Sequence, residues 1–136
     1  MTEIIRTAVL GAPRRLQVVG RPMPAAGPGQ VLVHVAATAV CHTDLKIYTC
    51  RHPGVRYPVV MGHEATGTIE KTGAGVAGLA TGQNVIINPI ISCGRCDQCL
   101  RGAENLCRKA GLFGREVDGS LSEYVSLDAR YVQPLH

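Results

Sequence analysis

Short apolar runs separated by turns rich in glycine and proline dominate the first part of the chain. Residues 4–10 and 16–19 are two such runs, and the turn at 11–13 between them predicts a β-hairpin. In residues 31–37 the apolar side chains recur with period two, so alternate residues share one face of a strand. This pattern predicts antiparallel β structure.

The second half of the chain repeats the pattern. Residues 85–88 are a predicted strand that Pro89 ends, and residues 121–125 and 130–133 are predicted closing strands. Residues 97–101 are long enough for one helical turn only. We therefore expect a mainly β fold with few short helices.

Composition favours the same fold class. The chain has 136 residues, which is enough for one domain with a hydrophobic core. It contains one Phe, four Tyr and no Trp, but 16 Gly and 8 Pro. This mixture is typical of a loop-rich β architecture and not of a helical bundle.

The charge pattern argues against a nucleic-acid partner. The formal net charge is +4, and the only adjacent basic pairs, at 14–15 and 108–109, are better explained as solvated surface. No apolar run approaches the about 20 residues of a membrane span. Residues 1–3 do not resemble a secretory signal, so we expect a cytoplasmic chain with no membrane partner.

Four cysteines lie close together at Cys93, Cys96, Cys99 and Cys107. Zinc binds four thiolates tetrahedrally, and a site filled by sulfur has no open position for chemistry, so this lobe predicts a structural zinc site. Two disulfides are a less favoured alternative, because thiols stay reduced in the cytosol. An iron–sulfur cluster is a weaker alternative.

A second group of potential ligands comes from two separate segments. Cys41, Thr43 and Asp44 follow the strand at 31–37, and His63 and Glu64 follow the apolar run at 58–61. Thiolate, imidazole and carboxylate are ligands that a catalytic zinc uses while one position stays open. The alternative makes Cys41 a small buried apolar residue and His63 a hydrogen-bonded surface residue.

Residues 73–78 match the pattern G-x-G-x-x-G of dinucleotide-binding folds. That fingerprint requires a buried strand before it and a helix after it. Here polar residues lie on both sides of the preceding segment, and residues 79–84 are too turn-like for a helix. We expect a loop between two strands and no nucleotide site.

The motifs Cys41-His-Thr-Asp-Leu and Gly62-His-Glu-Ala-Thr-Gly67, followed by the four-cysteine lobe, resemble the zinc-dependent medium-chain alcohol dehydrogenases. The resemblance covers that family's N-terminal half, a GroES-like, partly open β barrel. It implies that residues 1–136 form one catalytic domain with a zinc lobe at 93–107, and that the Rossmann half and the fourth ligand of the catalytic zinc lie beyond His136.

The resemblance also implies a function. It implies oxidation of a small alcohol, polyol or threonine-type substrate to a carbonyl compound by hydride transfer to NAD or NADP, with two zinc ions per chain. Without a Rossmann domain the chain alone would be inactive. The exposed apolar face of such an isolated half would favour a homo-oligomer. The alternative is a stand-alone zinc-binding structural or interaction domain without dehydrogenase activity.

Site roles carry over residue by residue. Cys41 and His63 resemble the ligands of the catalytic zinc, and Glu64 resembles the nearby carboxylate that can also bind it. Asp44 resembles the carboxylate that holds the second ring nitrogen of the zinc-bound histidine. Thr43 matches the hydroxyl that passes on the substrate proton.

Three positions fit the resemblance less well. Lys46 stands where the family often has the histidine that ends the proton relay, and lysine could serve there only with a lowered pKa. His42 resembles a position that contacts the cofactor pyrophosphate in some members, but it is equally explained as a surface residue. Cys50 has no partner by spacing, so we expect a free thiol.

Overall fold

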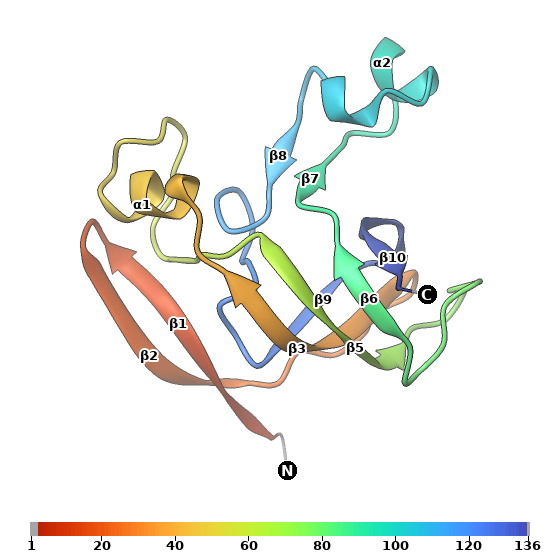
Figure 1. Cartoon of the computed structure of the whole chain (residues 1–136), viewed down its shortest axis with the longest axis horizontal. Coiled ribbons are helices and arrows are strands. Elements are labelled where there is room, and N and C mark those ends of the chain that lie inside the picture. The colour runs from red at the N-terminus through yellow and green to blue at the C-terminus, as the bar shows by residue number, and fades with distance from the viewer. Residues whose placement is uncertain (1–2, 136) are drawn as a thin grey trace.

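The computed structural model describes residues 3–135, and strands dominate it (Figure 1). No helix in this part of the chain is both long enough and apolar enough to cross a membrane. The strands are β1 Ile4–Ala12, β2 Arg15–Pro22, β3 Gln30–Ala39, β4 Val59–Val60, β5 Glu64–Thr72, β6 Asn84–Ile87, β7 Ile90–Ile91, β8 Gly111–Leu112, β9 Tyr124–Asp128 and β10 Val132–Pro134. The helices are α1 His42–Tyr48 and α2 Asp97–Leu100, with 3-10 turns at Glu104–Leu106 and Ala129–Tyr131.

The strands form two main sheets. One has the order β2-β1-β4 and the other the order β10-β6-β5-β3-β9, while β7 and β8 pair separately. The five-stranded sheet ends at β10 and β9, and it does not close into a full barrel. This arrangement confirms the predicted mainly β, GroES-like, partly open fold with short helices.

The predicted hairpin forms, with Ile5 opposite Arg21 and Val9 opposite Gln17. The central strand β3 pairs with β5 on one side and with β9 on the other. Val31 and Val33 are fully buried there, whereas His34 is exposed and stacks on Tyr124. The main core lies against the five-stranded sheet and consists of Val31, Val33, Ala65, Ile69, Val85, Ile87, Phe113, Val125, Leu127, Tyr131 and Val132.

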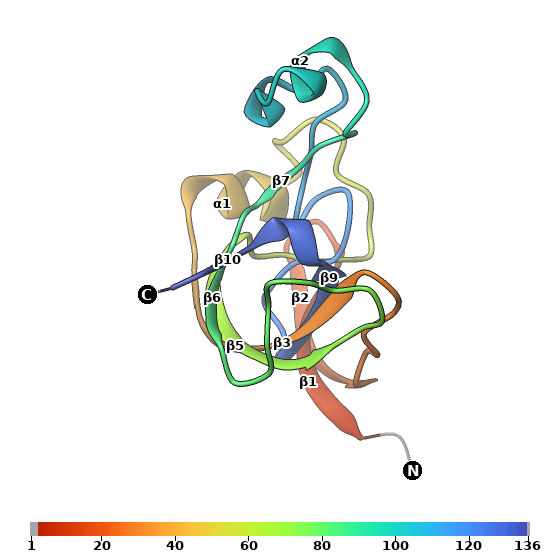
Figure 2. The same ribbon diagram turned by 90° about the vertical axis from the view of Figure 1, so that its right-hand side faces the viewer.

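The glycine-rich segment at 73–83 forms a loop between β5 and β6, and no helix follows it. This confirms that its G-x-G-x-x-G letters do not belong to a dinucleotide-binding turn. The four-cysteine lobe carries α2 and projects away from both sheets in two perpendicular views (Figures 1 and 2).

The sequence reasoning missed helix α1. Cys41 is its N-cap: the sulfur accepts a hydrogen bond from Thr43 N, and the Asp44 carboxylate accepts one from Cys41 N, which completes a capping box. The available signal was Asp44, the acidic residue three positions after Cys41. Below the helix, Ile47 packs with Leu10, Val59 and Met61 in a second core cluster.

The predicted strand at 121–125 was wrong at its start. Residues 121–123 pair with β1 in the other sheet: Ala8 N donates to Leu121 O, and Glu123 N donates to Arg6 O. Only from Tyr124 does the chain join β3 as strand β9. The segment therefore crosses from one sheet to the other, which a local apolar pattern cannot show.

Substitution of Gly67 by alanine should destabilise the domain strongly. Gly67 lies in β5 between Val35 of β3 and Val85 of β6, and an added Cβ would lie 2.2 Å from the carbonyl oxygen of His34. We expect a loss of about 2 kcal/mol or more in unfolding free energy, measured by urea denaturation with zinc present. Gly11→Ala is the control, because nothing lies within 4 Å of its added Cβ. Equal stability of the two variants would contradict this packing.

Candidate metal centres

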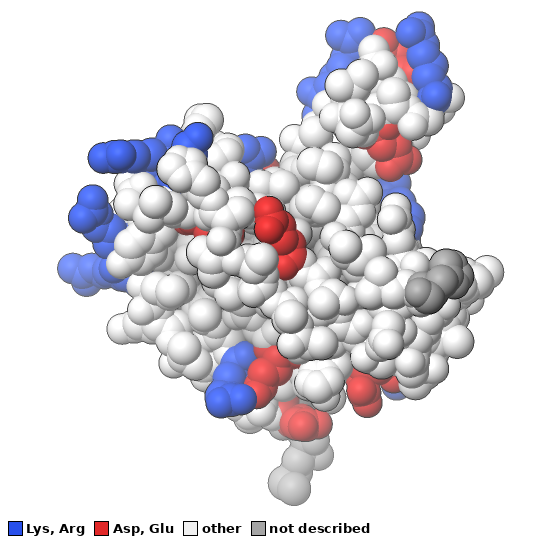
Figure 3. Space-filling view, in the orientation of Figure 1, with Lys and Arg blue, Asp and Glu red and all other residues white. Residues whose placement is uncertain are grey.

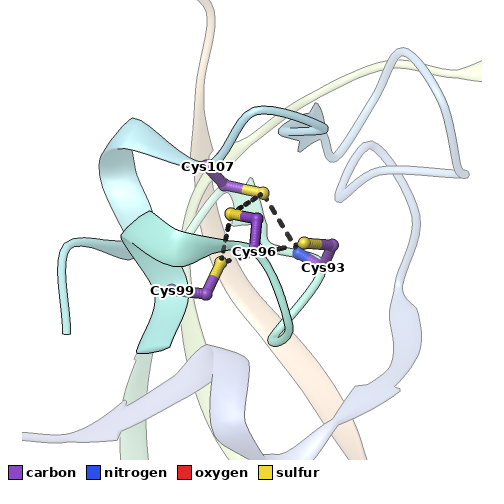
Figure 4. Close-up of side chains that lie close together, drawn as sticks. All are labelled: Cys93, Cys96, Cys99 and Cys107. Carbon is purple, nitrogen blue, oxygen red and sulfur yellow. Dashed lines mark hydrogen bonds between the residues drawn. The ribbon is translucent and has the colours of Figure 1, made fainter. Parts of the chain in front are cut away.

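The four lobe cysteines converge on one point (Figure 4). Their sulfurs lie 3.5 Å apart for Cys96 and Cys99, 3.9 Å for Cys93 and Cys99, and 4.0 Å for Cys96 and Cys107. A tetrahedron with Zn–S bonds of about 2.3 Å has edges of about 3.8 Å, whereas a disulfide needs about 2.05 Å. All four are free thiols, so the spacing fits a four-coordinate zinc ion and not a pair of disulfides.

The environment of the lobe lowers the pKa of one cysteine thiol and raises that of another. Backbone N–H groups of Cys99 and Arg108 point at the Cys96 sulfur and lower the pKa of that thiol to about 6. Burial, and then contact with the neighbouring thiols, raises the pKa of Cys99 to about 12. Part of the lobe is thus a ready thiolate, while Cys99 keeps its proton until a cation replaces it.

Ser92 ties the lobe to the barrel. Its carbonyl oxygen accepts hydrogen bonds from the Tyr131 hydroxyl at 3.1 Å and from Arg130 Nη2 at 3.3 Å. Its own hydroxyl donates to Glu104 at 2.8 Å. These contacts fix the residue immediately before Cys93, so the first sulfur has a set position relative to the core.

The second group assembles around Cys41 and His63. The Cys41 sulfur lies 3.0 Å from His63 Nε2, and one donor atom each of Cys41, Asp44 and His63 lies within 4.8 Å of the others. Cys41 is placed by the end of β3 and the start of α1, and the buried His63 directly precedes β5. Two segments more than 20 residues apart thus present a thiol and an imidazole to each other.

Asp44 holds the two segments together. It is 1% exposed; Oδ2 accepts from Cys41 N at 3.0 Å and Oδ1 accepts from Gly62 N at 3.1 Å. The same Oδ1 lies 3.5 Å from His63 Nδ1, which is too far for a good hydrogen bond. His63 Nδ1 is buried and has no other hydrogen-bond partner among residues 3–135. A proton on Nδ1 facing the carboxylate leaves the Nε2 lone pair directed at the Cys41 sulfur.

This donor set fits a zinc ion. A thiolate and a neutral imidazole are both zinc ligands, and the Asp44 carboxylate behind the histidine is the partner that such ligands have. The 3.0 Å between Cys41 Sγ and His63 Nε2 is shorter than the about 3.6 Å that tetrahedral bonds of about 2.3 and 2.05 Å imply. The pair would have to open by about 0.6 Å to hold the ion.

The other predicted site residues lie around this pair. Thr43 is half-buried beside the Cys41 sulfur, to which its backbone N donates at 3.2 Å. His42 and Lys46 are exposed on α1. Glu64 is exposed at the start of β5 and does not belong to the converging group of Cys41, Asp44 and His63.

A pocket of about 410 Å³ opens beside His63 and Glu64. Sequence reasoning missed the wall of this pocket, since nothing in the sequence separates these residues from ordinary strand positions. The lining is mainly apolar and consists of Ala37, Ala39, His63, Glu64, Ala65, Thr66, Ile86, Ile87 and Pro89.

Comparisons with known proteins bear on this arrangement. The family model of the alcohol dehydrogenase GroES-like domain matches residues 27–136. The chain is 42% identical over 119 residues to the alcohol dehydrogenase of Geobacillus stearothermophilus, covering 86% of this chain and 35% of that protein. It is 37% identical over 119 residues to the L-threonine 3-dehydrogenase of Pyrococcus furiosus, covering 85% of this chain and 34% of that protein.

A solved structure gives the same result for the fold. An alcohol dehydrogenase from Escherichia coli CFT073, complexed with the cofactor NADH, superposes with a TM-score of 0.90 at 31% identity, covering 98% of this chain and 39% of that chain. The chain thus spans about a third of the length of the curated relatives. It belongs to the zinc-dependent medium-chain alcohol dehydrogenase family, of which it carries the GroES-like domain.

Proposed function

We propose that this chain is the zinc-binding part of an NAD(P)-dependent dehydrogenase that oxidises the hydroxyl group of a small alcohol, polyol or threonine-type substrate. The observation that carries the proposal is the Cys41–His63 pair, held by the buried Asp44 at the edge of an apolar pocket. Its relatives include an alcohol and a threonine dehydrogenase, which agrees with this range of substrates.

Cys41 Sγ and His63 Nε2 would hold the catalytic zinc. When bound, that ion supplies a Lewis acid that makes a hydroxyl group easier to deprotonate. Asp44 keeps His63 in the tautomer whose Nε2 is free, and it keeps negative charge behind the ring, which makes the imidazole a better ligand. The exposed Glu64 is a further oxygen donor at the rim of the same pocket.

Thr43 would accept the proton of the substrate hydroxyl and pass its own outward. Its backbone N is fixed on the Cys41 sulfur, which sets the side chain at the start of α1 beside the metal pair. Lys46 lies one helical turn further along, exposed to solvent, where it would end the relay only as a neutral amine. The substrate carbon would lie against the apolar wall of the pocket, which excludes water from hydride transfer.

The nicotinamide cofactor would be held mainly by sequence outside this chain. NADH is the cofactor in the Escherichia coli structure, and we propose NAD or NADP here. His42, exposed at the first position of α1, is the residue of this chain that we propose to meet the cofactor phosphates. The four-cysteine lobe would hold a second zinc ion with a purely structural role.

The proposal predicts two zinc ions per chain, falling to one in Cys41→Ser. The lobe should keep its ion, because none of its ligands is touched. Cys50→Ser is the matched control, since this exposed thiol belongs to neither cluster, and it should keep two. Elemental analysis of dialysed protein measures the ratio. A single ion in both the natural chain and Cys41→Ser would remove the reaction centre and favour a purely structural zinc domain.

Cobalt substitution tests whether the Cys41 site is open. An ion with a free position should change its visible absorption when a small alcohol is added, whereas the sealed lobe should not respond. The change should be absent in Cys41→Ser. No response in the natural chain would show that the ion has no open coordination position and would contradict a catalytic role.

Asp44→Asn should weaken metal binding at the Cys41–His63 pair by about 10- to 100-fold. The amide nitrogen cannot accept the bonds from Cys41 N and Gly62 N together with the contact to His63. Chelator competition measures the affinity of each site. Asp97→Asn, which loses a surface ion pair with Arg108, is the control and should leave this affinity unchanged.

Zinc binding by the lobe should weaken as the pH falls, because protons compete with the ion for the thiolates. The Cys99 pKa of about 12 means that this thiol must lose a proton whenever the ion binds at neutral pH. Below the Cys96 pKa of about 6, the Cys96 thiol must also lose a proton, and the dependence steepens. Chelator competition with Cys41→Ser from about pH 5 to about pH 8 measures the slope. A flat profile would contradict these shifts.

A further inference from the structure

One corner of the molecule carries positive charge that no exposed carboxylate of its own segments offsets. Between residues 4 and 63 the only carboxylate is Asp44, which is buried. Besides Arg6, which pairs with Glu123, the same stretch contains five exposed basic residues that we call the basic corner: Arg14, Arg15, Lys46, Arg51 and Arg56. In the sequence these residues are dispersed over more than 40 positions, and the fold brings them together.

The segments that carry the basic corner are held together at the last turn of α1. Its last carbonyl groups accept three bonds from two separate segments: Tyr48 O from Arg14 N at 2.8 Å, Lys46 O from Arg51 N at 2.8 Å, and Ile47 O from the Tyr57 hydroxyl at 2.9 Å. The β1–β2 turn and the loop after α1 are therefore anchored on the same helix end. Cations are also favoured there by the helix dipole.

The side chains of the basic corner are unpaired. Within residues 3–135 none of the five forms an ion pair, whereas Arg6, Arg21, Arg108, Arg115 and Arg130 each have a carboxylate partner. Figure 3 shows lysine and arginine atoms over α1 and the adjacent end of the β1–β2 hairpin. Five neighbouring cations without counter-charge repel one another, so an anion placed among them would be stabilised.

A buried, unsatisfied donor lies against the same corner. The Arg115 Nη1 atom lies 3.3 and 3.5 Å from the two ring nitrogens of His52, whose backbone N bonds to Lys46 O. Glu116 pairs with Nη2, but the buried Nε has no hydrogen-bond partner. Buried polar groups without a partner call for a ligand, an ion or a water molecule.

We propose that the basic corner, with His52 and Arg115 at its edge, is a binding site for the phosphate group of a small molecule. The inference rests on the proposed function, because it assigns the site to a ligand of the same reaction. Helix α1 has seven residues and is about 10 Å long. A phosphate held by the arginine side chains beyond its C-terminal end, away from the helix carbonyl groups, would therefore lie at least about 10 Å from the Cys41 sulfur, which is the length of an extended polyol phosphate.

Two phosphate sources share this chemistry. One is a phosphorylated alcohol whose hydroxyl reaches the Cys41–His63 pair. The other is the 2′-phosphate of NADP, since the cofactor diphosphate is already proposed to meet His42 at the other end of α1. A nucleic acid is less well matched, because its evenly spaced phosphates need an extended basic stripe, whereas these cations surround a single helical turn.

The test is calorimetric titration of the zinc-loaded chain at low ionic strength, where charge interactions are least screened. The probes are inorganic phosphate, glucitol 6-phosphate and NADP. Arg51→Gln/Arg56→Gln should weaken phosphate binding by about tenfold or more. Arg95→Gln/Arg101→Gln on the zinc lobe removes the same charge from exposed, unpaired residues elsewhere and should change it by less than about twofold.

Each result bears on the proposal. Tighter binding of glucitol 6-phosphate than of NADP would identify a phosphorylated substrate, and the reverse would identify the cofactor. Absence of phosphate binding, equal losses in the two double variants, or tighter binding of duplex DNA, titrated as a fourth probe, than of glucitol 6-phosphate would overturn it. Cys41→Ser separates the two proposals: it should lose one zinc ion yet keep phosphate binding, so either can fail alone.

Discussion

The burial of one carboxylate is the constraint on which the rest of the site depends. Asp44 is removed from solvent, so its oxygens must find donors inside the protein. It finds them in the backbone of Cys41 and Gly62, in the two segments that carry the paired thiol of Cys41 and imidazole of His63. The requirement to satisfy one buried charge therefore also aligns a thiol with an imidazole, and no side chain of the pair has to be positioned separately.

The far end of the chain completes this arrangement. Gly119, Ser120 and Leu121 donate backbone hydrogen bonds to the carbonyls of residues 60–62, immediately before His63. The packing is so close that a Cβ on Gly119 would lie 2.0 Å from Gly62 O. The site thus needs three parts of the sequence, and the last of them holds residues 60–62 through its backbone. Gly119 is required because two segments of the backbone approach each other closely at this position.

Much of this could be predicted from sequence, and the remainder was non-local. Apolar alternation predicted the strands. Residue type and spacing predicted the donor residues of the two candidate metal centres. Helix α1 was not predicted, because its N-cap is a cysteine, which propensity rules do not associate with helix starts. The sheet change at 121–123, the pocket wall at Ala37 and Ile86, and the basic corner depend on contacts between distant segments, which local patterns do not contain.

The sulfur of Cys41 performs two tasks, since it faces His63 and also caps α1. A helix of seven residues has too few internal hydrogen bonds to persist without such support. Chemical damage to this one atom would therefore remove a ligand and, at the same time, unravel the scaffold on which Lys46 and the neighbouring arginines are mounted. Oxidation of the Cys41 thiol should accordingly appear as a loss of local order around α1 as well as a weaker affinity for metal.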